Sequence, residues 1–466
     1  MVNEKSVRRA LVTGASGFIG AQLVPALLAE GWTVRVLART PEKLNDEWRD
    51  QVEVSQGDAT DEDDLNNALA DVDVAYYLLH SMDGKGDFIE RDKEMAGRFA
   101  DAAKKQSAGR LVYMGGLHDD QADLAPHMAS RAEVGKILEE SGLPTTILQA
   151  GIVLGEGSAS FQMLRHLTER LPVAVAPKWV TNKVQPIDID DVTHYLVRAA
   201  DLPAEETGAL DIGMEESFTY RDMMSRYAQA TGLGSRFLAT IPVLTPDLAS
   251  RWVGLVTPVD AGVARPLVGS LVDDAVKGMG EARDAADVLG DPDSGLKSFD
   301  ESVREHTANI DPKRFGRIAS RVIAGVGAAA LVSTVIARST SSPSDKLKLS
   351  RLRGTLVAIA IPGVNALAAA GSAMAIAELI ENEKDGQARN YAVALGVNLV
   401  LDVGCSAARK RSRPLGLIVS GLLTASSVDL VRQAHSVRRQ LAPLIAPKAV
   451  WGVLGAATAV AMERRN

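Results

Sequence analysis

The chain has 466 residues, more than one ordinary domain needs, so we expect two or three structural units. Its charge is unevenly divided: residues 1–312 hold 30 Lys and Arg against 51 Asp and Glu, whereas residues 313–466 hold 21 against 8. The one cysteine, Cys405, excludes an internal disulfide framework and fits a reducing compartment.

The chain begins without the apolar core of a signal peptide, so we expect its first part to remain in the cytoplasm. Apolar runs then alternate with stretches of helical spacing. The predicted strands cover residues 10–13, 33–38, 52–55, 73–79, 110–114 and 145–149, and the first helix covers residues 18–30. This alternation predicts an α/β fold, a Rossmann-type doubly wound parallel sheet with helices on both faces. Residues 184–189 and 210–212 are expected at the sheet edge and in a substrate-side subdomain, completing a domain of residues 1–240.

Residues 241–312 are apolar but interrupted by prolines at 242, 246, 258 and 266. Two interpretations remain open for this segment. It is either a helical cap or linker over the substrate cleft, or an interfacial surface that faces a membrane.

Residues 313–466 form a third region of different character. Apolar stretches of membrane-spanning length occur at residues 322–337, 355–380, 391–408, 415–431 and 444–462. They are rich in small residues, which allow membrane helices to pack closely, and short basic loops separate them. We therefore expect an all-α membrane bundle of about five helices. The alternative is an Ala-rich soluble bundle, since Asp402, Asp429 and Lys448 lie within or at the ends of these stretches.

The sequence TGASGFIG at residues 13–20 stands between the first predicted strand and the first helix. In dinucleotide-binding folds Gly14 would permit the tight turn, Gly17 the approach of the pyrophosphate, and Gly20 close packing of helix on sheet. The free N–H groups of the helix N-terminus attract phosphate. We therefore predict a nicotinamide dinucleotide site, the alternative being a simple strand–helix turn.

The end of the second predicted strand indicates which dinucleotide is bound. NAD sites commonly place a carboxylate there, whereas an arginine meets the 2′-phosphate of NADP. Arg39 therefore favours NADP, with NAD still possible, unless Arg39 is simply solvated. Asp58 and Ala59 follow the third predicted strand, where contacts to adenine are expected.

Residues 8–310 resemble the atypical short-chain dehydrogenase/reductases of the NmrA-like group, which includes an accessory subunit of respiratory complex I. The resemblance rests on TGASGFIG, GDATD (57–61), YYLLHSM (76–82), SRAEVGKIL (130–138) and LQAGIVLG (148–155). It implies adenine contacts by Asp58 and Ala59, and nicotinamide contacts from residues 149–152. The candidate cofactor-binding residues are Gly14, Ser16, Gly17, Phe18, Ile19, Gly20, Arg39, Asp58, Ala59, Leu79, His80, Ser81, Gln149, Gly151 and Ile152.

The chain departs from this family at the catalytic positions. Active members use a Tyr-x-x-x-Lys pair with a Ser, where the Lys lowers the pKa of the Tyr. The matching positions here hold His127 and Arg131, and Gly115-Gly116 replaces the Ser. His127 could transfer a proton, because imidazole ordinarily titrates near neutrality. Arg131 could hold the nicotinamide ribose. In the alternative interpretation His127 lies on a surface loop and the chemistry is lost.

Residues 388–466 resemble the TspO/MBR family of five-helix membrane proteins, through NYAVALGVNLVLD, RSRPLGLIVSGLL and APLIAPKAVWGVLGAATAVAMERRN. Only Trp451 remains of the family's aromatic pocket in this region, so its ligands are not carried over. Five spans with a cytoplasmic N-terminus would place basic loops outside, against the positive-inside tendency, unless one segment is re-entrant.

The leading hypothesis is a membrane-tethered, NAD(P)H-binding oxidoreductase-like protein that acts on a hydrophobic or lipid substrate at the cytoplasmic membrane face. The alternative is a non-catalytic redox sensor, or an assembly or regulatory module, with the membrane region itself as a further candidate for the working unit. No metal site and no nucleic-acid partner are expected.

Overall fold

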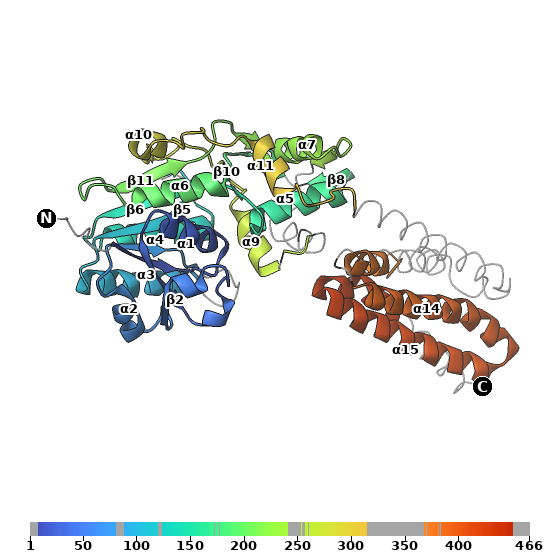
Figure 1. Ribbon diagram of the computed structural model, residues 1–466. Coiled ribbons are helices and arrows are strands. Elements are labelled where there is room, and N and C mark those ends of the chain that lie inside the picture. The colour runs from blue at the N-terminus through green and yellow to red at the C-terminus, as the bar shows by residue number, and fades with distance from the viewer. Residues whose placement is uncertain are drawn as a thin grey trace. The chain divides into compact units, whose positions relative to one another are not determined.

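The computed structural model describes residues 8–80, 88–119, 124–171, 173–176, 178–240, 253, 257–259, 261–314, 368–369, 371–380, 382 and 384–450. The chain divides into two compact units, Met1–Ile310 and Asp311–Asn466, drawn from blue to yellow and in orange to red in Figure 1. The division lies beside Pro312, where the charge pattern changes.

The first unit is built on an eight-stranded sheet in the order β14-β11-β6-β5-β4-β1-β2-β3, and every neighbouring pair is parallel. The order 3-2-1-4-5-6 of the first six strands is that of a Rossmann-type fold, so the predicted sheet is confirmed. The strands are β1 Arg9–Thr13, β2 Thr33–Ala38, β3 Glu53–Gln56, β4 Val74–Tyr77, β5 Arg110–Gly116, β6 Thr145–Ala150, β11 Gly208–Ile212 and β14 Arg283–Asp284.

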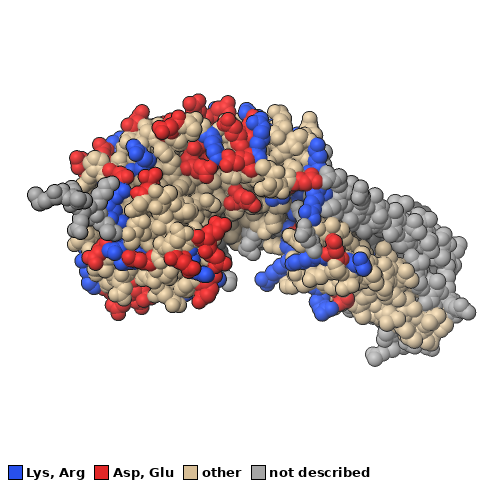
Figure 2. Space-filling model, viewed as in Figure 1, with Lys and Arg blue, Asp and Glu red and all other residues tan. Residues whose placement is uncertain are grey.

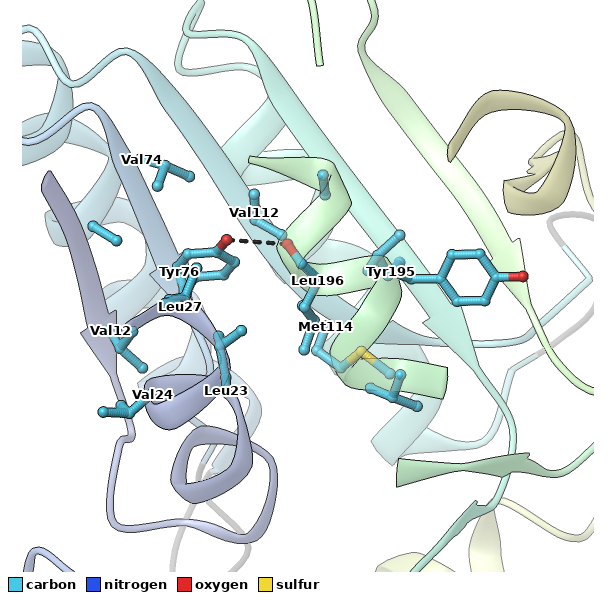
Figure 3. Packing of buried hydrophobic residues seen from close by; sticks show 14 of the residues in the cluster. Val12, Leu23, Val24, Leu27, Val74, Tyr76, Val112, Met114, Tyr195 and Leu196 are labelled. Carbon is cyan, nitrogen blue, oxygen red and sulfur yellow. Dashed lines mark hydrogen bonds between the residues drawn. The ribbon is translucent and has the colours of Figure 1, made fainter. Parts of the chain in front are cut away.

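Helices cover both faces of this sheet, as its continuously apolar central strands require. α1 (Phe18–Ala29) and α6 (Ile189–Ala199) pack on one face, and α2 (Glu62–Leu69), α3 (Phe88–Lys105) and α4 (Pro126–Glu139) pack on the other. On the first face, Leu23 and Leu27 of α1 pack beside Tyr76 of β4 (Figure 3). The Tyr76 hydroxyl donates a hydrogen bond of 3.0 Å to the Leu196 carbonyl, which ties α6 to the sheet.

A separate hydrophobic core forms the smaller subdomain of this unit. Its helices are α5 Ala159–Arg170, α7 Tyr220–Ala230, α9 Ala261–Gly269 and α11 Phe299–His306. Three two-stranded sheets pair β7 Val153–Leu154 with β10 Ile187–Asp188, β9 Lys183–Val184 with β12 Phe218–Thr219, and β8 Val173–Ala176 with β13 Phe237–Thr240. Val184, Ile187 and Asp188 therefore belong to these small sheets, and Ile189 begins α6. The short β14 forms the edge of the main sheet instead. Among the described residues of this unit, further helices are α10 Ala285–Leu289, η1 Pro41–Lys43, η2 Arg49–Gln51 and η3 Lys178–Thr181.

The second unit contains a helical hairpin of α14 (Asp385–Arg411) and α15 (Arg413–Val437), followed by η5 (Arg439–Leu441). Ser412 separates the two long helices, and its hydroxyl accepts a hydrogen bond from the Leu415 N–H at the start of α15. Residues 371–380 and 442–450 are also helical. The hairpin covers two of the predicted apolar stretches, 391–408 and 415–431.

Within the described part of the chain, none of the helices is both long and apolar enough to cross a membrane. The charges of Asp402 in α14 and of Asp429 and Arg432 in α15 interrupt the apolar runs. The predicted bundle of membrane spans is therefore not supported by these helices. The predicted stretch 322–337, most of 355–380 and the end of 444–462 lie outside the described residues. The likeness to the TspO/MBR family stays a prediction.

Candidate active site at the carboxyl edge of the sheet

The glycine-rich turn after β1 has the geometry that the sequence motif predicts. Gly14 has a φ of +71°, and a Cβ there would lie 2.7 Å from the Leu78 carbonyl oxygen. A Cβ on Gly20 would lie 2.4 Å from the Gly14 carbonyl oxygen, so this glycine allows α1 to approach the turn. Gly17 is the N-cap of α1, and its N–H donates to the Gly14 carbonyl at 2.9 Å. The backbone at this turn is thus left uncovered, which fits the pyrophosphate of a dinucleotide.

A cavity of about 370 Å³ opens from this turn along the carboxyl ends of β1, β4, β5 and β6. Its volume lies within the range of small-molecule sites, about 300–1,000 Å³. The cavity brings together most of the predicted site residues: Gly14, Gly17, Phe18, Ile19, Gly20, Leu79, His80, His127, Arg131, Gly151 and Ile152. Ser16 is exposed on the turn and does not line the cavity, and Ser81 lies outside the described residues.

The residues predicted to bind the adenosine half lie apart from this cavity, at the ends of β2 and β3. An Arg39 guanidinium nitrogen lies 3.9 Å from Asp58 Oδ2, and the Arg39 side chain is 78% exposed. Hydrogen bonds from Thr60 and the charge of Arg39 hold the pKa of Asp58 below its ordinary value. Ala59 is buried beside them. Arg39 is therefore accessible to a 2′-phosphate, with a carboxylate beside it that can accept from a ribose hydroxyl.

His127 and Arg131 lie one turn apart on α4, as the Y-x-x-x-K spacing requires, and both line the cavity. Arg131 Nε donates a hydrogen bond of 3.3 Å to His127 Nε2. A ring nitrogen that accepts from arginine carries no proton, so the hydrogen of this neutral imidazole is on Nδ1.

Burial, the charge of Arg131 and the nearby His80 together lower the pKa of His127 to about 3. The expectation that His127 titrates near neutrality is therefore corrected: desolvation and a neighbouring cation both disfavour imidazolium. His127 can donate a hydrogen bond through Nδ1 at pH 7, but it holds no acidic proton there.

His80 follows β4 and faces the same positive group. Burial and Arg131 lower its pKa to about 4, with Asp92 acting in the opposite direction. The His80 side chain is exposed, whereas that of His127 is half-buried. On the sheet side of α4, Ser130 donates to the buried Asp92 of α3 at 3.3 Å. This bond helps to fix the helix that carries His127 and Arg131.

Sequence reasoning missed the residues that make the cavity apolar. These come from loops and from helices distant in the chain: Leu117, Met128, Met163, Leu267 and Leu271. The sequence shows only that these residues are apolar. It contains no local signal that distinguishes the lining of a cavity from a hydrophobic core. Gln149, predicted to lie by the nicotinamide, lines a neighbouring cavity of about 580 Å³ that shares Arg131 with the first.

Residues 14–184 match the family model described as NAD(P)H-binding. The chain is 25% identical over 229 residues to the ceramide reductase of Caulobacter vibrioides, covering 49% of this chain and 72% of that protein. It is 22% identical over 248 residues to the photosystem II assembly factor Ycf39 of Trieres chinensis, covering 52% and 75%.

Among solved structures, the triphenylmethane reductase of Citrobacter sp. complexed with NADP(H) superposes with a TM-score of 0.50. That likeness has 16% identity and covers 64% of this chain and 99% of the other. At this identity the likeness shows the fold alone. Together with the family match over residues 14–184, the turn and the sheet define an NAD(P)-binding domain with a Rossmann-type fold in the first unit, so the predicted cofactor class is confirmed.

Proposed function

We propose that the protein is an NAD(P)H-dependent oxidoreductase that reduces a hydrophobic substrate, with NADPH as the preferred cofactor. One observation carries this proposal. One cavity is lined by the phosphate-binding glycines, by a predominantly apolar set of side chains and by the His127–Arg131 pair. A bound nicotinamide would supply a hydride at this place.

The apolar lining supports a hydrophobic substrate. Leu117, Met128, Met163, Leu267 and Leu271 lie around a few polar groups, an arrangement typical of sites for apolar molecules that carry one reacting polar group. The similarity to a ceramide reductase supports the same substrate class.

Arg131 and His127 act on the substrate in different ways. The Arg131 guanidinium stabilises negative charge that develops on a substrate oxygen when hydride arrives. His127 Nδ1–H orients that oxygen by a hydrogen bond, and Arg131 fixes the tautomer that makes this possible. The proton that completes reduction comes from solvent in this proposal, because His127 is neutral.

The test is photometry of NADPH oxidation with candidate ketolipids and quinones, after native mass spectrometry for a copurified cofactor. We expect turnover with at least one acceptor, and a loss of at least about a hundredfold in Arg131→Met at unchanged melting temperature. Turnover that is equal in Arg131→Met would refute the assigned role of Arg131. Absence of turnover across the acceptors, with cofactor bound, would favour the second candidate.

The second candidate is a non-catalytic redox sensor or assembly module whose cofactor occupancy controls a partner. The neutral His127 favours this candidate, because a site without an acidic side chain performs general acid catalysis poorly. The similarity to an assembly factor supports it as well. Under this hypothesis NADPH changes the affinity for a partner, and His127→Ala leaves that change intact.

We also propose that the protein works at the cytoplasmic face of a membrane, to which its second unit attaches it. The support is compositional: residues 313–466 carry 21 Lys and Arg against 8 Asp and Glu, with long apolar stretches between them. Basic segments are attracted to anionic lipid surfaces. Carbonate extraction of the full chain from cell membranes tests this proposal, and recovery of all of it in the extract would contradict it.

A further inference from the structure

A second cavity, of about 580 Å³, adjoins the one that contains the glycine-rich turn. Its lining comes from β5 and β6, from α4, and from residues 207–209 and 281–283. Gly115 and Arg131 line both cavities. The first cavity, of about 370 Å³, has to hold the nicotinamide as well as the reacting part of a substrate. A larger substrate therefore needs further room at this place.

Gln149 of β6 brings a buried amide to the second cavity. The residue is 7% exposed, and within the described part of the chain its side-chain amide makes no hydrogen bond. Gln185, with 6% exposure, differs: its Nε2 donates to the Met214 carbonyl at 2.5 Å, and its Oε1 accepts from the Lys277 N–H at 2.8 Å. Buried polar groups are almost always hydrogen-bonded. The unpaired amide of Gln149 thus points to a partner from outside the chain.

Glycines leave room around this amide. A Cβ on Gly115 would lie 3.7 Å from Cγ of Gln149 and 3.2 Å from Cγ2 of Ile147. A Cβ on Gly135 of α4 would lie 3.0 Å from Cδ1 of Ile147. Because neither glycine carries a side chain, the surface next to Gln149 is left uncovered and a ligand can reach the amide.

Charged side chains of both signs line the second cavity. They are Arg131, Lys136, Arg283, Glu139 and Glu281. Two of the basic groups already have partners, since Arg131 donates to His127 at 3.3 Å and Arg283 donates to Glu206 at 2.9 Å. Burial raises the pKa of Glu139, which shows that this wall disfavours a negative charge.

The surface of the first unit is also of mixed sign. On the face that Figure 2 draws, Asp and Glu are spread among Lys and Arg. Such a surface gives an anionic head group little long-range attraction. An uncharged group that has both a donor and an acceptor therefore suits the second cavity better than a phosphate or a carboxylate does.

We propose that the second cavity holds the uncharged polar part of the substrate, an amide group hydrogen-bonded to Gln149, while the apolar part stays in the first cavity. An amide matches glutamine because its N–H donates to Oε1 while its oxygen accepts from Nε2. The inference deepens the oxidoreductase function proposed above and rests on it.

The experiment measures binding to the full chain saturated with NADP⁺, so it needs no turnover. The probes are octanamide, octanoate and octylamine at pH 7, which share an alkyl length and differ in the charge of the head group. Ligand-observed NMR titration gives their dissociation constants for the parent, for Gln149→Leu and for Gln229→Leu. Gln229 is exposed on α7 and serves as the matched control. Gln149→Leu should keep the parental melting temperature, because the amide that it removes has no partner in the chain. Gln149→Met is the second variant should the branched side chain disturb packing.

We expect the parent to bind octanamide at least about tenfold more tightly than the two charged probes. Gln149→Leu should weaken octanamide binding about tenfold and keep the affinity for NADP⁺ within about twofold, and Gln229→Leu should change neither. Equal affinities of the parent for the three probes, or no binding of octanamide, would overturn the proposal and leave the amide to water. Equal octanamide binding by the parent and Gln149→Leu would overturn it as well. A tenfold loss of NADP⁺ affinity in Gln149→Leu would assign the amide to the nicotinamide instead.

These outcomes are separate from a failure of the proposed function. If no acceptor oxidises NADPH while octanamide binds as expected, the ligand class of the second cavity stands and the reductase assignment alone fails.

Discussion

At the scale of single residues, a substitution of Gly17 tests cofactor binding without preventing folding. A Cβ on Gly17 would meet only the Gly14 carbonyl oxygen, at 3.1 Å, whereas a Cβ on Gly20 would lie 2.4 Å from the same atom. We therefore predict that Gly17→Val folds but binds NADPH at least about a hundredfold more weakly, because its side chain occupies the place of the pyrophosphate. Calorimetric titration measures this, with Gly97→Ala in open space as the control. Parental affinity in Gly17→Val would disprove the assignment.

We propose that Arg39 sets a preference for NADPH over NADH. Its guanidinium is exposed and only 3.9 Å from Asp58, so part of any gain from a 2′-phosphate is offset by solvent and by that carboxylate. We predict that Arg39→Ala weakens NADPH binding about tenfold and leaves NADH binding nearly unchanged. Titration of both cofactors checks this, with Arg49→Ala as a control. An equal loss for both cofactors would remove the claim of NADPH preference.

The protonation of His127 can be observed directly. Because Arg131 Nε donates to His127 Nε2 and the pKa of His127 is about 3, the imidazole should not titrate between pH 5 and 8. Imidazole carbon-13 NMR measures this, and in Arg131→Gln the pKa of His127 should rise, since a neighbouring positive charge is removed. A His127 signal that titrates between pH 6 and 7 in the parent protein would restore it as a proton donor.

At the scale of elements, α11 is fastened to α6 and β10 by a charged cluster. His306 Nε2 lies 2.9 Å from Oδ2 of the fully buried Asp188, and the hydrogen bond to this carboxylate raises the pKa of His306. Lys297, just before α11, bonds to Asp190 and Glu305 at 2.5 and 2.6 Å. The cluster holds the smaller subdomain on the main sheet.

This cluster makes the stability of the first unit depend on pH. The pKa of His306 is higher in the folded state than in the unfolded state. Its contribution to the free energy of unfolding is therefore complete below the ordinary histidine pKa of about 6.5, and it is lost as pH rises through the folded-state pKa. Urea denaturation at pH 6, 7 and 8 should show falling stability, and His306→Gln should flatten this dependence. A parental slope in His306→Gln would contradict the argument.

Asp191 belongs to the same charged cluster and affects the stability of the first unit at lower pH than His306 does. Burial, with the charges of Asp188 and Asp190, raises its pKa to about 6, although the Lys297 N–H bonds to it. The folded state disfavours the charged carboxylate, so this residue costs stability as pH rises from about 4 through 6. Asp191→Asn should therefore be more stable than the parent at pH 7 by about 1–3 kcal/mol, measured by the same denaturation series. Lower stability of Asp191→Asn at pH 7 would contradict this.

At the scale of the whole molecule, the two units are expected to behave independently. The first has its own sheet and three cores, and residues 14–184 match the NAD(P)H-binding family. We predict that a fragment of residues 1–310 unfolds cooperatively and keeps the NADPH affinity of the full chain within about twofold, because each core buries its own apolar surface. Calorimetry on both proteins tests this, and a tenfold loss in the fragment would show that the second unit supports the site.

The sequence by itself determined the features that depend on local spacing. The apolar runs and the helical spacing located β1 to β6 and α1, and the glycine spacing of residues 14–20 located the cofactor turn. The charge contrast marked the division beside Pro312. These features are local because hydrogen bonding and side-chain direction repeat over a few residues.

Only the tertiary structure decided the chemistry of the site. Leu267 and Leu271 line the cavity because distant helices pack over it. His127 is neutral because burial and the Arg131 bond act together, and neither effect is visible in a histidine-to-arginine spacing of four. Burial and charge proximity arise from contacts between segments far apart in sequence, and these contacts set pKa values and accessible surface.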